Sequence, residues 1–272
     1  MVRSLILAVL LLAFPSPELS SEEQSPVQLL FEGYYKITID GSHSGYVIQR
    51  YRLDRNKKEF ESTYFIRTSE AAGNTAESLK ATANQRFEPL AYEYTWASGP
   101  ENSRQIDARF VGQTMMARTG EESIRLELPE GTFLSSFLSY LMLQSGLKKG
   151  LRLSYQTVLE ESGSLAQGVA RITGETELFG LKAFKVENRL IEEGKGESRF
   201  VSHITPEGVV LKNSSPERKI EFTLVAQAEE ATRGFQLPTS TIETLFGSVP
   251  AGRTHPLASP IDQNLPEENP ES

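Results

Sequence analysis

The sequence has 272 residues, with 28 Lys and Arg against 36 Asp and Glu, so its formal net charge is −8. This charge argues against nucleic acid or anionic lipid as an electrostatic partner, because both carry negative charge. The hydrophobic share of 38% is sufficient for a packed core. The chain has no cysteine, which excludes disulfides and a diacylated lipoprotein anchor.

The first 21 residues have the pattern of a secretory signal peptide. Arg3 precedes an apolar run over residues 5–14, and prolines and serines follow. The run is too short for a transmembrane helix, so we expect a Sec-type signal, cleavage after Ser21 and no transmembrane anchor after processing. A chain of this size without cysteine fits the bacterial envelope, which predicts a periplasmic or secreted protein. Residues 22–30 are predicted to be a polar spacer.

Residues 31–235 are dominated by short segments in which apolar and polar residues alternate. Leu90, Tyr92, Tyr94 and Trp96, for example, share one face of a predicted strand. Turn-forming residues separate the segments at short intervals, which is typical of antiparallel meanders. The predicted strands cover residues 35–39, 45–53, 60–68, 78–87, 90–96, 105–111, 114–118, 124–128, 151–159, 169–178, 183–191, 198–205, 209–213 and 220–226.

Between the two runs of strands, residues 132–145 have the periodicity of a helix. The apolar positions cover most of its circumference, which is typical of a buried helix, and Thr132 and Gly146 are its predicted caps. The apolar residues are Phe133, Leu134, Phe137, Leu138, Leu141 and Met142. An antiparallel sheet buries such a helix most simply by curling around it. We therefore predict a mainly β fold, a large curved antiparallel sheet or half-barrel wrapped around one central helix. Two small β domains with the helix as a hinge are the alternative.

From residue 236 on, prolines interrupt an acidic sequence with little periodicity. This composition predicts that residues 236–272 form a mostly disordered tail, with at most one short element at residues 242–246.

Three segments resemble a known group of proteins. They are Ile39-Asp40-Gly41 followed by Gly45-Tyr46, the GLKAFKV segment at residues 180–186, and FVSHITPEGVVLK at residues 200–212. Together, residues 31–226 resemble exported bacterial proteins of the DUF3108-like group and the β module that precedes the catalytic domain of some transglutaminase-like proteins. The resemblance implies a curved sheet around a helix, akin to periplasmic lipoprotein-carrier half-barrels, and no catalytic residue. The tryptophan usual in the strand before the second turn is absent here.

No motif in the sequence carries a complete catalytic or metal site. Residues 41–45 have the spacing of a nucleophile elbow, but His43 occupies the place of the nucleophile. Ser145 and Lys148 have S-x-x-K spacing without the accompanying motifs. Metal-ligand spacing is also missing among the three histidines, His43, His203 and His255. We predict no enzyme, no catalytic residue, no metal and no cofactor.

The predicted architecture favours a non-enzymatic envelope protein. We expect an apolar cleft between sheet and helix that binds a lipid or acyl chain, or a protein partner of the envelope. The candidate cleft residues are Phe137, Leu141, Tyr92, Tyr94 and Trp96. Two alternatives remain open: a structural or accessory module of an envelope complex with a filled core, and a hydrolase of unrecognised type.

Overall fold

The computed structural model describes residues 25–99 and 101–258, and within them fifteen strands form one sheet. The strands are β1 (Val27–Ile39), β2 (Ser42–Asp54), β3 (Glu59–Thr68), β4 (Thr75–Asn84), β5 (Pro89–Ser98), β6 (Ser103–Val111), β7 (Thr114–Thr119), β8 (Glu122–Glu127), β9 (Phe133–Leu134), β10 (Arg152–Leu159), β11 (Ser164–Leu178), β12 (Leu181–Glu192), β13 (Gly196–Ile204), β14 (Val210–Ser215) and β15 (Ile220–Leu224). The helices are the 3-10 turns η1 (Glu70–Ala72) and η2 (Ser135–Phe137) and the α-helices α1 (Leu138–Gln144), α2 (Ala228–Thr232) and α3 (Thr239–Phe246).

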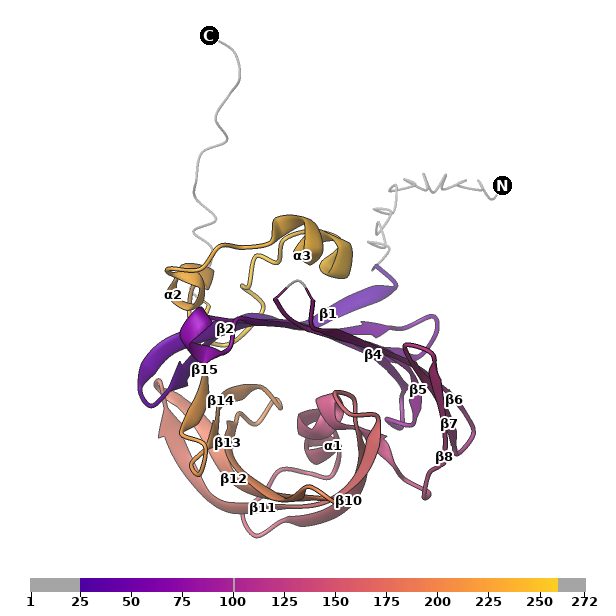
Figure 1. Ribbon diagram of the computed structural model, residues 1–272. Helices are drawn as coiled ribbons and strands as arrows, with labels where there is room; N and C mark the ends of the chain where they lie inside the picture. Colours follow the sequence, from indigo (N-terminus) through magenta and orange to yellow (C-terminus); the bar gives the residue numbers. More distant parts are fainter. Residues whose placement is uncertain (1–24, 100, 259–272) are drawn as a thin grey trace, which may run out of the picture.

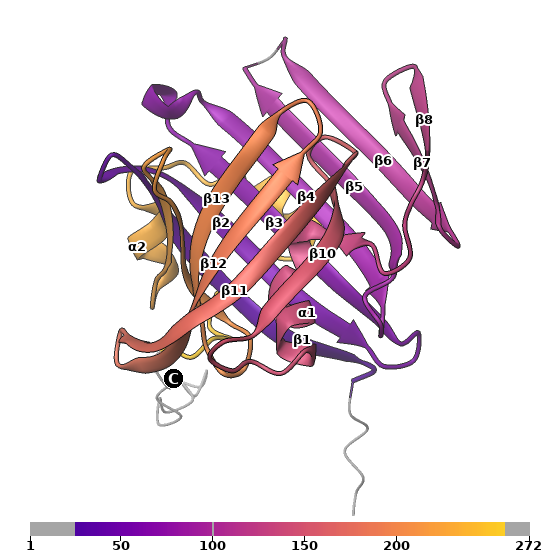
Figure 2. The ribbon, with the colours of Figure 1, turned by 90° about the horizontal axis from the view of Figure 1, so that it is seen from below.

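The sheet consists of two meanders that meet at β1 and β15. Strands β1 to β8 follow one another outward, and β10 to β15 return until β15 pairs antiparallel with β1, with Tyr35 opposite Leu224. Only β9 pairs in parallel, with β10, among the strand pairs of the described residues. The whole sheet curls around α1, as Figure 1 and the view from below in Figure 2 show. The predicted curved antiparallel sheet around one central helix is thereby confirmed.

The central helical segment is shorter than predicted. Phe133 and Leu134 are extended in β9, η2 follows, and α1 begins only at Leu138, so Thr132 is not the N-cap. Thr132 instead donates its hydroxyl hydrogen to the carbonyl of Pro129. The reason is tertiary: Phe133 and Leu134 pair with β10, and this ladder outweighs their helical spacing. Gly146 does adopt the predicted left-handed conformation, with φ of 79°.

The turn between β10 and β11 closes the concave side of the curved sheet. Gly163 lies where a Cβ atom would contact the Tyr92 hydroxyl at 3.5 Å and Ile106 at 4.0 Å, on β5 and β6. Arg104 on β6 donates to the carbonyl of Ser162 at 3.3 Å. The two meanders therefore touch at this turn as well as at the β1–β15 ladder, and α1 lies between them.

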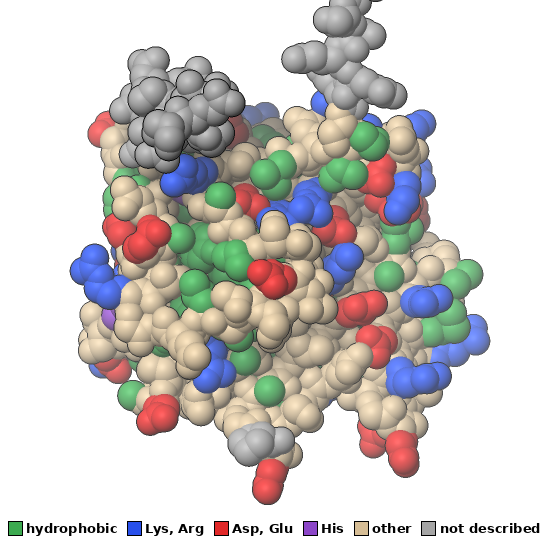
Figure 3. Space-filling view, turned by 90° about the horizontal axis from the view of Figure 1, so that it is seen from above, with side chains coloured by type: hydrophobic (Ala, Val, Ile, Leu, Met, Phe, Trp, Pro, Cys, Tyr) green, Lys and Arg blue, Asp and Glu red, His purple; other side chains and the backbone are tan. Residues whose placement is uncertain are grey.

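The C-terminal segment packs on the convex face of β1 to β3, which corrects the prediction of a disordered tail for residues 236–258. Residues 259–272 lie outside the described residues. A second apolar cluster fills this contact; it comprises Tyr34, Tyr46, Ile48, Phe65, Val225, Ala231, Ile242 and Phe246. Figure 1 shows α2 and α3 above the sheet, on the side opposite α1. In Figure 3, which views the molecule from this side, basic and acidic side chains are interspersed around small apolar groups.

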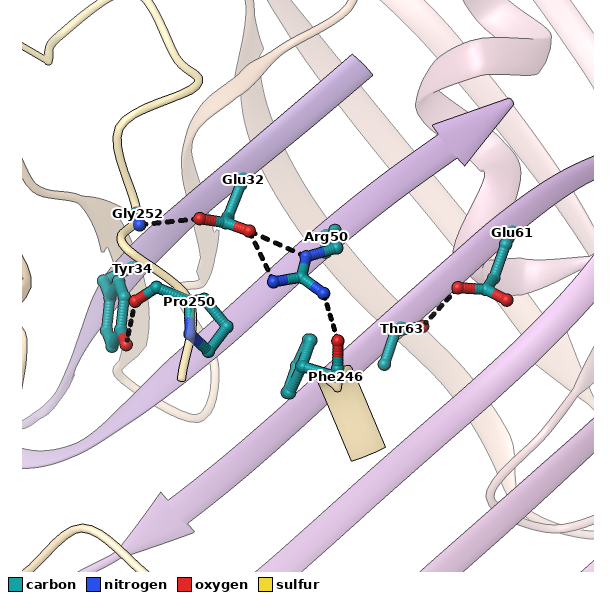
Figure 4. Close-up of polar contacts among 8 residues, drawn as sticks. All are labelled: Glu32, Tyr34, Arg50, Glu61, Thr63, Phe246, Pro250 and Gly252. Atoms are coloured by element: carbon teal, nitrogen blue, oxygen red, sulfur yellow. Dashed lines mark hydrogen bonds and ion pairs between the residues drawn. The ribbon is translucent and has the colours of Figure 1, made fainter. Parts of the chain in front are cut away.

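A buried ion pair fastens this segment to the sheet (Figure 4). Glu32 on β1 and Arg50 on β2 are each 5% exposed and lie 2.7 Å apart. The guanidinium also donates to the Phe246 carbonyl at 2.6 Å, and Glu32 accepts from the Gly252 amide at 2.9 Å. Beyond the end of β15, Thr254 pairs with the backbone of Glu32. Every strong hydrogen-bonding group of the pair therefore has a partner, which a buried charge requires.

Two boundaries near the N-terminus also differ from the prediction. β1 begins at Val27, inside residues 22–30 that were predicted to be a spacer, because its first residues pair with the end of β2. The turn after β1 has two residues, whereas the predicted strands left residues 40–44 between them. Asp40 and Gly41 have φ of 49° and 78°. Positive φ at both central positions is the type I′ geometry that suits a hairpin, and Asp-Gly is a preferred pair for it.

Candidate functional site

A cavity of about 380 Å³ lies between α1 and the concave face of the sheet. Residues from β1 to β3 form one wall, β10 and β12 to β15 form the opposite wall, and β9, η2 and α1 form the floor. Seven aromatic side chains line it: Tyr35, Tyr51, Tyr64, Phe133, Tyr155, Phe200 and Phe222. This cavity is the candidate site, because a partly apolar cavity with a few polar groups is the usual form of a small-molecule site.

The β1–β3 wall is held by tyrosines that bond across the cavity. Tyr51 donates to the Ser136 carbonyl at 2.7 Å, which ties β2 to the 3-10 turn before α1. Gln49, the next inward residue of β2, donates to the Tyr51 oxygen at 2.6 Å. Tyr35 on β1 donates to the Val210 carbonyl at 2.9 Å and so links the first wall to the second. These bonds fix the width of the cavity.

On the opposite wall, Gly168 leaves room for the aromatic ring of Tyr155 to lie directly against it. A Cβ atom at Gly168 would lie 2.1 Å from the Tyr155 ring, so only glycine fits beneath it. The ring in this position lets the Tyr155 hydroxyl reach Asn188 Oδ1 at 2.7 Å. Ser202 and Asn213, farther along this wall, are joined by a hydrogen bond of 3.2 Å. The wall thus has polar groups at inward positions, each paired with a neighbour.

A buried carboxylate positions the floor. Glu160 is 2% exposed and accepts from the Ser135 hydroxyl at 2.5 Å and from the Ser136 amide at 3.1 Å. Burial raises the pKa of this carboxyl, and the bonds to Ser135 and Ser136 oppose that rise. Glu160 therefore connects the turn after β10 with the first residues of η2 and sets where α1 begins.

Glu161, the next residue, is the one charged side chain among the described residues that line the cavity. It retains a large accessible surface, as expected for a group that lines an open space. Although the residue as a whole is exposed, the surrounding protein atoms partly desolvate its carboxyl, and this desolvation together with the nearby Glu160, Glu192 and Glu77 raises its pKa to about 6. The cavity therefore carries a carboxylate at neutral pH, and no Lys, Arg or His of residues 25–99 or 101–258 lines it.

None of the five residues proposed from the sequence lines this cavity. Phe137 is fully buried beside it, packed against Tyr51 and Phe87. Leu141 is only half-buried. Tyr92, Tyr94 and Trp96 lie on β5, where Tyr92 and Tyr94 are buried in the core near the β10–β11 turn and Trp96 is half-buried.

In the two motifs with catalytic spacing, His43 and Ser145 make hydrogen-bonding contacts that support the fold. His43 is part of β2, and its Nε2 lies 3.0 Å from the Ala231 carbonyl and so contacts the C-terminal segment. Ser145 donates to the Leu141 carbonyl at the end of α1. Within the described part of the chain, no group of three potential metal ligands occurs. Helices long and apolar enough to cross a membrane are likewise missing from the described ranges.

Because the pKa of Glu161 is raised in the folded protein, the charged carboxylate lowers stability. The folded state binds this proton more tightly than the unfolded state, so the stabilising contribution is present below about pH 4.5 and is lost as pH rises through about 6. We expect Glu161→Gln to raise the melting temperature at about pH 8 and to leave it nearly unchanged at about pH 4.5. Thermal denaturation at the two pH values tests this; a variant less stable than the parent at about pH 8 would contradict it.

Comparison with known proteins supports the fold. Neither a protein-family model nor a curated protein sequence matches the chain significantly. A solved β-barrel-like protein of the domain of unknown function DUF1849 from Brucella abortus is similar, with a TM-score of 0.53 at 10% identity over 73% of this chain and 97% of that one. A DUF1089 family protein from Pseudomonas aeruginosa matches with a TM-score of 0.40 at 12% identity, over 63% and 90% of the two chains. At such identities the first of these similarities establishes that the chain has a β-barrel-like fold.

Proposed function

We propose that this protein is a non-enzymatic module of the bacterial envelope that holds an apolar ligand between its sheet and α1. The observation that carries the proposal is the cavity of about 380 Å³ lined by seven aromatic side chains. Its volume lies within the range of about 300 to 1,000 Å³ that is usual for small-molecule sites. A lipid with one acyl chain, or another elongated apolar molecule, is the class of ligand that such a lining favours.

The cavity also weighs against a purely structural module with a filled core. Protein interiors are normally close-packed, and unfilled space costs contacts that the lining atoms would otherwise make. Here Tyr35 is bonded to β14 of the opposite wall and Tyr51 to the Ser136 carbonyl of the floor, so specific hydrogen bonds hold both side chains at the edge of the cavity. A cavity whose lining side chains are fixed by specific hydrogen bonds is more typical of a ligand site than of a packing defect.

The envelope location is part of the proposal and rests on the sequence alone, since residues 1–24 lie outside the described residues. The basic Arg3 and the short apolar run support export. The resemblance of residues 31–226 to DUF3108-like exported proteins points to the same compartment. A fusion of residues 1–24 to a reporter active only outside the cytoplasm should give signal in a bacterial host. Retention of the reporter in the cytoplasm would refute the location.

The ligand is tested by what co-purifies with the protein. Full-length protein from a bacterial host, purified without harsh detergent, should carry apolar molecules that native mass spectrometry and solvent extraction detect. Ser139 on α1 lines the cavity, so Ser139→Trp should reduce the bound fraction at least about fivefold by occupying its volume. Ser145→Trp is the matched control, because Ser145 is exposed at the end of the same helix. Repeated absence of bound molecules in the parent, or equal loading of both variants, would reject the proposal.

A further inference from the structure

The polar groups of the cavity differ from those of a site for an anionic lipid. We propose that the ligand is an apolar molecule with an ammonium end group, held by Glu161 and by aromatic side chains. This inference rests on the proposed function and specifies the chemistry of the same cavity. It is supported by the charge of the lining, by the direction of its hydrogen bonds and by its aromatic content.

The charge of the lining is negative. Glu161 contributes a carboxylate, and in the described part of the chain no basic residue lines the cavity to neutralise it or to pair with a ligand carboxylate or phosphate. The charges that act on Glu161 from the surrounding elements include Glu160 beside it, Glu192 on β12 and Glu77 on β4, which share its sign. Lys195 pairs with Glu192 at 2.6 Å, and Arg104 is exposed and donates to Ser162. An anion would therefore lose its hydration shell and gain no counter-charge in the cavity.

Most hydroxyl groups of the lining are used as donors within the protein. Six of the nine donate to protein acceptors, and their oxygen lone pairs remain for a ligand. These bonds are Tyr35 to the Val210 carbonyl, Tyr51 to the Ser136 carbonyl, Ser135 to Glu160, Tyr155 to Asn188, Thr157 to the Phe133 carbonyl and Ser202 to Asn213. Among the described residues, the hydroxyls of Tyr64, Ser136 and Ser139 make no such bond, and all three are uncharged. The six oxygens that already donate can still accept, and an ammonium group, which is a donor only, can use them.

The aromatic content favours a cation for a second reason. The negative face of an aromatic ring attracts an ammonium ion, and sites for substituted ammonium groups in proteins are commonly built from several such rings. Tyr35, Tyr51 and Tyr64 belong to one wall and Tyr155, Phe200 and Phe222 to the other, so a ligand in the cavity meets rings on both sides. The same rings are apolar enough to receive a hydrocarbon chain. One lining therefore accommodates both parts of the proposed molecule.

Isothermal titration of the full chain with three octyl compounds tests the inference. At about pH 8, well above the pKa of Glu161 of about 6, octylammonium should bind at least about tenfold more tightly than octanoate, with octanol between them. Lowering the pH to about 5 should weaken octylammonium binding, because Glu161 becomes protonated. Octanoate binding as tight as octylammonium at about pH 8 would overturn the inference and leave the apolar site standing. If none of the three compounds binds, the proposed function fails as well.

Two variants test whether Glu161 causes the preference for octylammonium over octanoate. Glu161→Gln should reduce the ratio of octylammonium to octanoate affinity at least about fivefold while octanol affinity stays unchanged. Glu193→Gln removes the same charge from an exposed position nearby and should leave the ratio as it is in the parent. An unchanged ratio in Glu161→Gln, or an equal change in both variants, would show that the carboxylate of Glu161 does not select the ligand.

Discussion

Replacement of Arg50 by methionine is expected to lower the free energy of unfolding by about 3 to 5 kcal/mol. The substitution leaves the carboxylate of Glu32 buried at 5% exposure, where the backbone amide of Gly252 is its one remaining hydrogen-bond donor among the described residues. It also removes the hydrogen bond to the Phe246 carbonyl and the contact of the guanidinium with the Phe246 ring, 5.1 Å from its centroid. Chemical denaturation of the purified variant measures the effect.

Two controls separate the burial of the pair from the loss of an arginine. Arg125→Met makes the same substitution in the ion pair of Arg125 with Glu127, where the arginine side chain is 75% exposed. It should lower the free energy of unfolding by less than about 1 kcal/mol. The double variant Glu32→Leu with Arg50→Met removes both charges and should recover part of the stability that the single variant loses. An Arg50→Met variant as stable as the Arg125→Met control would mean that the C-terminal segment does not cover this pair.

Replacement of Phe137 by alanine should cost about 3 to 5 kcal/mol. The ring is completely buried and packs between Tyr51 and Phe87, with centroid distances of 6.3 and 5.9 Å. Its loss removes apolar area and leaves a space next to the cavity that the two flanking rings cannot fill without moving. Equilibrium unfolding in denaturant gives the difference directly.

Leu141→Ala is the matched comparison on the same helical segment. Leu141 is only half-buried, so the structure predicts a loss below about 2 kcal/mol, smaller than the spacing of apolar residues alone suggests. A Phe137→Ala variant within about 0.5 kcal/mol of the parent, the range of surface substitutions, would be incompatible with a helix enclosed by the sheet.

The strands and the overall curvature could be predicted because they follow from one repeated pattern. In β5, for example, Tyr92 and Tyr94 point into the core while Glu93 and Thr95 are exposed, as strict alternation requires. Alternation of this kind in two runs, with one apolar helical segment between them, is sufficient to predict a sheet around a helix. It does not set the boundaries of that helical segment, where pairing with β10 converts Phe133 and Leu134 to a strand.

Docking of the C-terminal segment was missed because its proline-rich composition resembles that of a disordered tail. A signal for it was present elsewhere in the sequence. Tyr46, Val47 and Ile48 are consecutive apolar residues in β2, and all three are buried, Val47 in the inner core and the other two beneath the C-terminal segment. Consecutive apolar residues in a strand indicate burial on both faces, so something had to cover the outer one.

A cleft between sheet and helix was predicted, but the residues that line it were missed, for a related reason. Large apolar residues such as Phe137 and Tyr92 are buried in close-packed parts of the core. Choosing candidates by apolar size therefore selects packed residues and not those that line a cavity. The residues that line the cavity include polar ones at inward positions of otherwise apolar strands, Gln49 between Val47 and Tyr51 and Asn188 between Val186 and Leu190. A polar residue at a position where alternation demands an apolar one is the sequence signal for a site, although the pattern alone does not show how these residues meet.

The most direct test of the central claim, that the sheet and α1 enclose a ligand site, is photo-crosslinking with an octylammonium analogue that carries a diazirine on its chain. After irradiation of the full chain and digestion, mass spectrometry locates the labelled peptides. The structure predicts labels on residues from all three sides of the cavity, such as Tyr51, Met142 and Phe200, and competition by excess octylammonium. Labels confined to exposed apolar residues such as Val111 and Phe179, or labels that excess ligand does not suppress, would contradict it.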